Sequence, residues 1–162
     1  MSGAEIYHGP WPEFHYCNKA NDGQIFELES LSIVSIHTPG HTPGCMSYAV
    51  IDKETGKDPV LVFTGDALFV NEVGRTDLGG KDKRREWSAN LYDSINNKLL
   101  PLGDNVIIYP AHGAGSVCGS HLAEREVSTL GTERLMNPLL QITRKKFLKY
   151  KEEEIHELPP YF

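Results

Sequence analysis

Two histidines fall in a stretch that is too rich in proline and glycine to be a helix or a strand. Residues 37–45 read HTPGHTPGC and contain His37 and His41. Because apolar runs precede and follow this stretch, the density of Pro and Gly predicts a tight, stiff loop between two strands. Such a loop can present an imidazole as a metal ligand or a proton-transfer group. For this loop alone, a turn with merely polar histidines is an equally good interpretation.

Two further polar side chains follow apolar runs farther along the chain. Asp66 comes after the run at residues 60–63, and His112 comes after the run at residues 105–109. In layered α/β proteins, the loops that leave strands at one edge carry ligands and catalytic groups. Each residue alone would more often be structural. Together, His41, Asp66 and His112 place two imidazoles and a carboxylate at one edge, which predicts a metal site.

Hydrophobic patterning predicts the α/β domain that must position this edge. Strands are expected at residues 4–7, 24–28, 31–36, 45–51, 60–63 and 105–109. The continuous apolar runs at 60–63 and 105–109 are typical of strands buried on both faces. Apolar residues at every fourth position predict a helix over about residues 84–100 with a core-facing stripe, namely Trp87, Leu91, Ile95 and Leu99. Further helices are expected at about 121–136 and 143–155, with a restart at Asn137–Pro138.

Composition excludes several classes of protein. The 162 residues carry a formal net charge of -6, which argues against a nucleic-acid surface. The sequence contains no apolar run of membrane-spanning length and no signal peptide. Three widely spaced cysteines, Cys17, Cys45 and Cys118, suit free thiols in a reducing cytosol. We expect a cytoplasmic protein that binds neither nucleic acid nor membrane.

Three sequence motifs resemble the last three ligand motifs of the metallo-β-lactamase superfamily, in order and in spacing. They are PGHTPG around His41, FTGDALF around Asp66 and YPAHG around His112. Residues 73–78 (VGRTDL) and 111–119 (AHGAGSVCG) resemble the persulfide dioxygenase branch, whose bacterial members can be fused to rhodanese domains. The resemblance covers nearly the whole chain. It implies an α/β fold, an αββα sandwich with the site at one edge.

The resemblance also implies a ligand set. In persulfide dioxygenases one Fe(II) is held by two histidines and one aspartate, with positions open for substrate and O2. His41 and Asp66 match two of these ligands, whereas His112 matches a histidine that binds a second metal only in hydrolytic relatives. Arg75 and Asp77 match a supporting loop, in which the arginine either holds an anionic substrate or, as we favour, pairs with Asp77 as a brace.

Three residues near these motifs are given structural roles. His37 is expected to brace the loop rather than to bind metal. The thiols of Cys45 and Cys118 are assigned to packing rather than to the site.

The first ligand motif of the superfamily, His-x-His-x-Asp-His, does not occur in this sequence, and His8 and His15 lack its spacing. The resemblance therefore assigns residues 1–157 to the C-terminal part of an N-terminally truncated domain, with 158–162 as a linker or cut end. Two ligands cannot fix a metal in the geometry of the family, so this chain should bind iron weakly or not at all. Exposed apolar surface should make it self-associate, as a homodimer for example.

The resulting functional expectation is a domain from a persulfide dioxygenase. Such an enzyme uses Fe(II) and O2 to oxidise glutathione persulfide, a small-molecule substrate, to sulfite, and the isolated chain would be incomplete and inactive. One alternative is a zinc thioester hydrolase of the glyoxalase II type, in which Asp66 bridges two metals. The 74–77 loop speaks against that alternative, as does the lack of a clear helical extension that would bind glutathione. A non-catalytic remnant or interaction module is the other alternative.

Overall fold

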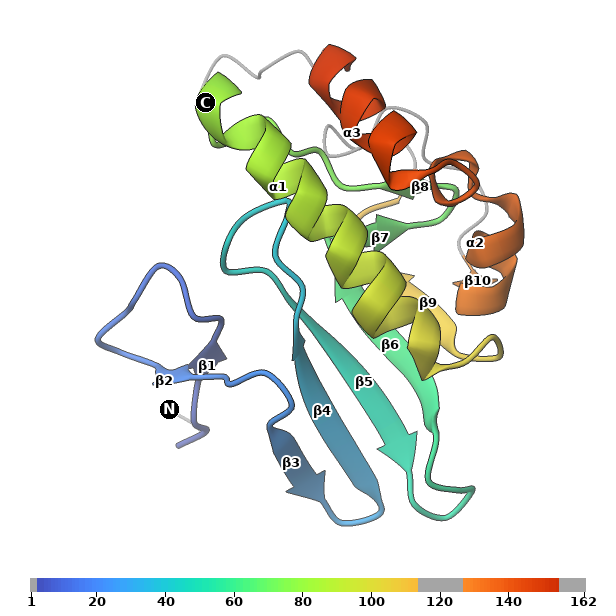
Figure 1. Cartoon of the computed structure of the whole chain (residues 1–162). Coiled ribbons are helices and arrows are strands. Elements are labelled where there is room, and N and C mark those ends of the chain that lie inside the picture. Colours follow the sequence, from blue (N-terminus) through green and yellow to red (C-terminus); the bar gives the residue numbers. More distant parts are fainter. Residues whose placement is uncertain (1–2, 114–126, 155–162) are drawn as a thin grey trace.

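A computed structural model describes residues 3–113 and 127–154 of the chain. Its centre is a six-stranded sheet with the strand order β10-β9-β6-β5-β4-β3 (Figure 1). The strands are β3 (Ile25–Leu28), β4 (Leu31–His37), β5 (Met46–Asp52), β6 (Pro59–Gly65), β9 (Ile107–Pro110) and β10 (Ser128–Thr129). The strands expected between residues 24 and 109 are therefore confirmed, with ends shifted by at most two residues.

The strand directions bring three loop starts to one edge of the sheet. Strands β3 to β6 are antiparallel neighbours, whereas β6 and β9 run parallel. Since β4 and β6 both pair antiparallel with β5, they point the same way, and β9 points with them. The carboxyl ends of β4, β6 and β9 therefore share one edge, which is where the sequence places His41, Asp66 and His112.

One face of the sheet is covered by helices. Helix α1 (Lys81–Ser94) continues into a π-turn (Ile95–Leu99) and a 3-10 turn (Leu100–Leu102), and α3 (Arg144–Glu153) packs beside it (Figure 1). Helix α2 (Leu130–Met136) and a second 3-10 turn (Pro138–Leu140) lie near the β9 side. The predicted stripe is in the core: Leu91, Ile95 and Leu99 are fully buried with Ile36, Ala49, Val62 and Ile108 of the sheet, while Trp87 is half-buried.

The other face of the sheet is largely open, and here the sequence-based expectation is wrong. Strands β6 and β9 were expected to be buried on both faces, yet Phe63 is 48 % exposed and Tyr109 is 43 % exposed. Over the described residues, only the segment with β1 (Tyr7–His8) and β2 (Asn18–Lys19) lies against this face, beside β3 and β4 (Figure 1). Apolar residues on both sides of a strand predict two-sided burial only if something covers each side.

Smaller differences concern local elements. The stretch at 67–83, expected as loop, contains a short hairpin of β7 (Leu68–Phe69) and β8 (Glu72–Val73). A helix was predicted over 121–136, but Ser128 and Thr129 form strand β10, which pairs with β9. Helix α2 therefore begins only at Leu130, with Thr129 as its N-cap. The part of that prediction before residue 127 lies outside the described residues. None of the helices in the described ranges is both long enough and apolar enough to cross a membrane.

Candidate metal centre

His41 is held in one orientation by the loop that follows Asp66. Its side chain is 7 % exposed, and its Nδ1–H donates to the carbonyl oxygen of Arg75 at 2.9 Å. A hydrogen bond from one ring nitrogen to a backbone carbonyl fixes the tautomer and leaves the other nitrogen as an acceptor or metal ligand. Nε2 of His41 is therefore the nitrogen that can bind a metal.

Asp66 follows β6 and lies next to His112, which follows β9. Gly65 pairs with Pro110, and the Ala111 amide donates to the Gly65 carbonyl at 3.0 Å, so the two loops leave the sheet together. His112 Nε2 lies 3.1 Å from Asp66 Oδ1. That contact does not have the geometry of a hydrogen bond, and Oδ1 is buried with no hydrogen-bond partner among the described residues. A buried carboxylate oxygen in this state calls for an explanation such as an ion.

The loop 74–77 approaches this edge closely because Gly74 has no side chain. A Cβ atom at Gly74 would lie 1.9 Å from the Asp66 carbonyl oxygen and 3.3 Å from His41 Cβ. Arg75 is 2 % exposed, and its Nε and Nη2 donate to the two Asp77 carboxylate oxygens at 2.7 and 2.9 Å. This bidentate ion pair is the bracing contact favoured from the sequence, and it keeps the carbonyl of Arg75 facing His41.

A second set of contacts braces the histidine loop from the other side. His37 Nε2–H donates to the Pro43 carbonyl at 2.7 Å, so His37 supports the loop as expected. Lys98 Nζ donates to the His37 carbonyl at 2.7 Å and to Asp22 Oδ2 at 2.8 Å. Sequence analysis missed Lys98 and Asp22, because residues so far apart in the chain give no signal of their contact.

Burial favours the neutral forms of His41 and Cys45 in the histidine loop. Burial lowers the pKa of His41, and the Asp66 carboxylate together with the Arg75 carbonyl only partly offsets that effect. A neutral imidazole is the form that binds metal. Burial raises the pKa of the half-buried Cys45 thiol, which lies 3.1 Å from the Thr42 hydroxyl. Cys45 is therefore kept as a thiol, in line with its assignment to packing, whereas Cys118 lies outside the described residues.

These donors fit part of a metal site. His41 offers a neutral Nε2, and Asp66 offers a buried oxygen with no hydrogen bond. Within residues 3–113 and 127–154, however, no group of three His, Cys, Asp or Glu side chains is placed to hold a metal ion. His41 and Asp66 would supply two ligands there, and the others would have to come from groups beyond these two ranges, from solvent or from substrate.

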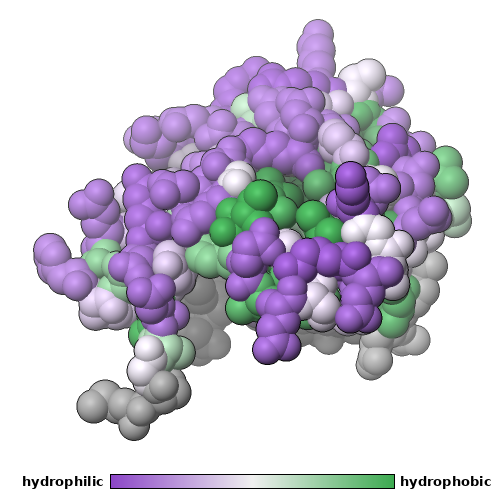
Figure 2. All heavy atoms as spheres, turned by 90° about the horizontal axis from the view of Figure 1, so that it is seen from below, coloured by the Kyte–Doolittle hydropathy of each residue, from purple (hydrophilic) through white to green (hydrophobic). Residues whose placement is uncertain are grey.

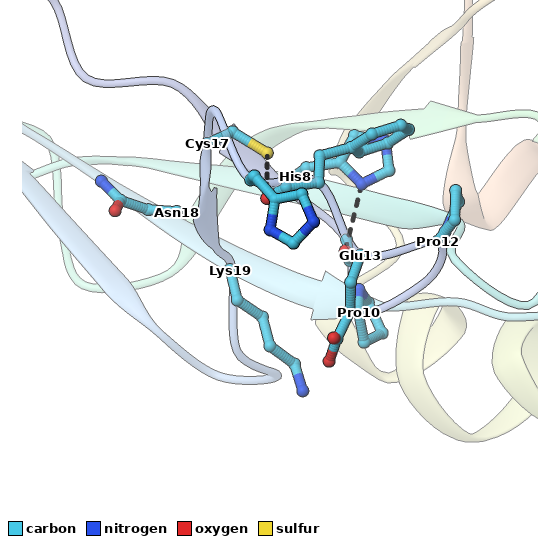
Figure 3. A pocket seen from close by; sticks show the side chains of 10 residues that line it. His8, Pro10, Pro12, Glu13, Cys17, Asn18 and Lys19 are labelled. Carbon is cyan, nitrogen blue, oxygen red and sulfur yellow. Dashed lines mark hydrogen bonds between the residues drawn. The ribbon is translucent and has the colours of Figure 1, made fainter.

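A separate pocket is formed by the N-terminal segment. His8, Glu13, Cys17 and Lys19 surround this space of about 170 Å³ (Figure 3). The His8 ring packs edge-on against Phe14 with centroids 4.7 Å apart. The residues that line this pocket come from a single stretch of chain, and none of the three strand-end loops described above contributes to it. The strand-end site therefore remains the candidate that several elements build together.

Comparison with known proteins identifies the family. Residues 3–112 match the metallo-beta-lactamase superfamily. The chain belongs to this superfamily. The fold and family expected from the His41, Asp66 and His112 motifs are thus confirmed.

Two curated relatives of this superfamily member come from different enzyme classes. The chain is 31% identical over 132 residues to the mitochondrial persulfide dioxygenase ETHE1 of Bos taurus, which covers 82% of the chain and 44% of that protein. It is 34% identical over 119 residues to the hydroxyacylglutathione hydrolase GloC of Haemophilus influenzae, covering 74% of the chain and 45% of that protein. The chain therefore spans less than half the length of these relatives.

Solved structures give the same picture. A metallo-beta-lactamase from Staphylococcus aureus matches with a TM-score of 0.83 and 27% identity, over 97% of the chain and 47% of that structure. ETHE1 from Myxococcus xanthus matches with a TM-score of 0.74 and 27% identity, over 93% and 58%. A protein named TTHA1623, solved in a di-iron-bound form, matches with a TM-score of 0.52 and 30% identity, over 81% and 52%. Members of the superfamily bind metals, and one of these neighbours holds iron.

Proposed function

We propose that this chain is part of a persulfide dioxygenase, an enzyme that oxidises the terminal sulfur of a glutathione-type persulfide to sulfite with O2. The observation that carries the proposal is that Asp66 lies beside one histidine, His112, while a second histidine, His41, offers a ring nitrogen to a metal. The Asp66 carboxylate faces His112 at 3.1 Å, while His41 Nε2 remains free to bind. An aspartate that shares a metal with one histidine, while a second histidine lies beside it without a hydrogen bond, suits a single metal ion. Similarity to persulfide dioxygenase ETHE1 supports the same class.

The residues have distinct roles in this proposal. His41 and Asp66 bind Fe(II), which would supply the O2 chemistry. His112 lies beside the Asp66 carboxylate and does not bind the metal. Arg75 braces the loop, because its guanidinium is buried and donates to both carboxylate oxygens of Asp77. The free cysteines Cys17 and Cys45 support a location in a reducing compartment, which we propose is the cytosol.

The test is to purify the protein expressed from its complete gene, measure iron and zinc by elemental analysis, and follow O2 consumption with glutathione persulfide. We expect iron near one equivalent and sulfite production. His41→Gln and Asp66→Asn should each lose most of the iron and at least about 100-fold in activity. His8→Gln, a substitution in the separate N-terminal pocket, is the matched control and should change neither. Full iron content in Asp66→Asn would contradict the assignment.

The second candidate is a zinc thioester hydrolase of the glyoxalase II type. It is favoured by the proximity of His112 to Asp66, because a bridging carboxylate with a histidine beside it can hold two metals. Similarity to the hydrolase GloC agrees with it. Two equivalents of zinc, thioester hydrolysis and no O2 consumption would replace the first proposal with this one. In the hydrolase, His112→Gln should lose one metal, whereas in the dioxygenase it should keep its iron.

The 162-residue chain by itself is proposed to be inactive, because its described residues offer two ligands rather than three. Mixed with Fe(II) and passed over a chelating column, it should retain well under one equivalent of iron. Retention of one full equivalent, with persulfide oxidation, would show that this chain is an enzyme without further parts.

A further inference from the structure

Three buried residues with hydroxyl groups lie beneath the edge of the sheet that carries His41 and Asp66. Thr38 directly follows β4, Ser47 is the second residue of β5, and Thr64 is the last residue but one of β6. All three are 0 % exposed. A buried hydroxyl that lacks a hydrogen bond costs free energy, so the partners of these groups show which segments they hold together.

The hydrogen bonds between these residues run in one direction. Ser47 Oγ donates to the Thr64 carbonyl oxygen at 3.3 Å, because a carbonyl oxygen can only accept. The single hydroxyl proton of Ser47 is used in that bond. The Thr38 hydroxyl is therefore the donor in the 2.9 Å contact between Thr38 Oγ1 and Ser47 Oγ. We call this chain of two hydrogen bonds, from Thr38 through Ser47 to Thr64, the hydroxyl bridge.

The Thr38 end of the hydroxyl bridge closes the loop that contains His41. The Thr38 amide donates to the Cys45 carbonyl at 2.9 Å, so these two residues are held together at the base of the loop. Ser47 follows two residues after Cys45. Since side chains alternate along a strand, Ser47 and the buried Ala49 point to the same, helix-covered face. A change in the position of Thr38 would therefore move the loop that carries His41.

The Thr64 end of the hydroxyl bridge holds the turn that presents Asp66. The Thr64 carbonyl also accepts from the Ala67 amide at 3.1 Å, which makes residues 64–67 a β-turn. Gly65, at the second position of this turn, has a φ of 55°, which glycine adopts without strain. The Thr64 hydroxyl donates to the Leu68 carbonyl at 2.6 Å, so both sides of the turn are fixed. The position of Asp66 is thus set through its backbone.

The opposite edge of the sheet is held together differently. There, Lys53 in the turn between β5 and β6 contacts Glu27 of β3 at 3.0 Å, and their side chains are 40 % and 64 % exposed. Figure 2 looks onto this edge and shows mostly hydrophilic side chains around a hydrophobic area. An exposed ion pair restrains its partners weakly. A buried hydroxyl bridge can hold two loops at the fixed spacing that a metal centre requires.

We propose that Ser47 is a positioning residue for the metal centre, because its hydroxyl sets the spacing between the His41 loop and the Asp66 turn. This inference rests on the ligands assigned to His41 and Asp66 under the proposed function. Without Ser47 Oγ, the buried Thr38 hydroxyl loses its acceptor, and the Thr64 carbonyl keeps only the bond from the turn. Groups that hold metal ligands in place affect metal affinity although they do not touch the metal.

The first test measures Fe(II) affinity by anaerobic competition with a chelator, using the protein expressed from its complete gene. Ser47→Ala should weaken Fe(II) binding about 10- to 100-fold. Ser32→Ala is the matched control, since Ser32 is also buried but its hydroxyl donates to Glu27 at the opposite edge. This control should leave the affinity unchanged. Unchanged affinity in Ser47→Ala, or an equal loss in Ser32→Ala, overturns the proposal.

His41→Gln, measured in the same series, separates this inference from the proposed function. If His41→Gln binds Fe(II) as tightly as the unmodified protein, the ligand assignment is wrong and the role of Ser47 falls with it. If His41→Gln loses Fe(II) whereas Ser47→Ala keeps it, the ligand assignment stands and only the positioning role is overturned.

The second test distinguishes the hydroxyl bridge from simple packing at Thr38. Thr38→Val keeps the shape of the side chain but removes the donor to Ser47, so it should weaken Fe(II) binding in the same range as Ser47→Ala. Thr38→Ser keeps the hydroxyl and loses only a methyl group, so it should stay close to the unmodified protein. The reverse order, with Thr38→Val tolerated and Thr38→Ser weakened, overturns the proposal. Circular dichroism checks that each variant folds, and the Thr38 pair decides if Ser47→Ala does not.

Discussion

The two faces of the six-stranded sheet have similar amino-acid types but different surroundings. On β9, Ile108 is fully buried with the stripe of α1, whereas its neighbours Ile107 and Tyr109 point to the open face. Strand β6 shows the same contrast between the buried Val62 and the exposed Phe63. An apolar run therefore shows that both faces of a strand are suited to burial, but it does not show whether another layer of the protein covers each face. The covered face should therefore carry most of the stability of the chain.

The most direct test of this comparison is to make the same change, isoleucine to alanine, once on each face of β9. Ile108→Ala should lower the free energy of unfolding by about 4 kcal/mol, because it opens a cavity in a filled core. Ile107→Ala, on the half-buried open face, should cost about 1 kcal/mol in the monomer. Urea unfolding at low protein concentration measures both values. Equal losses would mean that the open face is covered in solution.

Loss of the buried ion pair between Arg75 and Asp77 should have the next largest effect on the free energy of unfolding. Asp77→Asn removes the negative charge that the buried Arg75 guanidinium donates to and should cost about 3 kcal/mol. Glu27→Gln is the matched control, since it removes the same charge from the exposed pair with Lys53 and should change stability little. If the two substitutions had the same effect in thermal unfolding, burial of the Arg75 pair would not matter.

Gly74 tests how tightly the loop is packed on the site. Gly74→Ala should cost about 2 kcal/mol, because its Cβ would overlap the Asp66 carbonyl oxygen. The shift should also break the bond from His41 Nδ1–H to Arg75, which is seen as loss of the slowly exchanging imidazole proton by NMR. Gly56→Ala, where no atom lies within 4 Å of the new Cβ, is the control and should leave both unchanged. An intact imidazole signal in Gly74→Ala would separate the loop from the orientation of His41.

The smallest effect is expected at Asp22, on the exposed rim of the histidine loop. Burial alone would raise the pKa of Asp22, but hydrogen bonds from Lys98 and from the His37 amide lower it overall. Its contribution is fully present above the ordinary value of 3.8 and is lost as the pH falls through the lower folded pKa. Asp22→Asn should cost less than about 1 kcal/mol at pH 7, because solvent screens an exposed pair. The difference between the two proteins should shrink below about pH 4 in urea titrations, and a constant difference would contradict this.

Much of the architecture could be predicted from local patterns, because these patterns act over a few residues. Alternation and runs located β3 to β6 and β9, and the four-residue spacing located α1. The motifs identified His41, Asp66 and His112, and the strand directions bring their loops to one edge. The predictions failed where the answer depended on distant chain segments. Pairing with β9 made Ser128 extended, and an uncovered face left Phe63 in solvent.

The sequence by itself determined the stiff loop around His41, the types of the side chains in the candidate site and membership of the superfamily. These follow from residue identity and spacing alone. Only the tertiary structure decided that the Arg75 carbonyl orients His41, that His112 lies against Asp66 and that Lys98 supports His37. It also decided which face of the sheet stays open. Contacts between residues far apart in the chain depend on how the layers pack, and no local pattern encodes them.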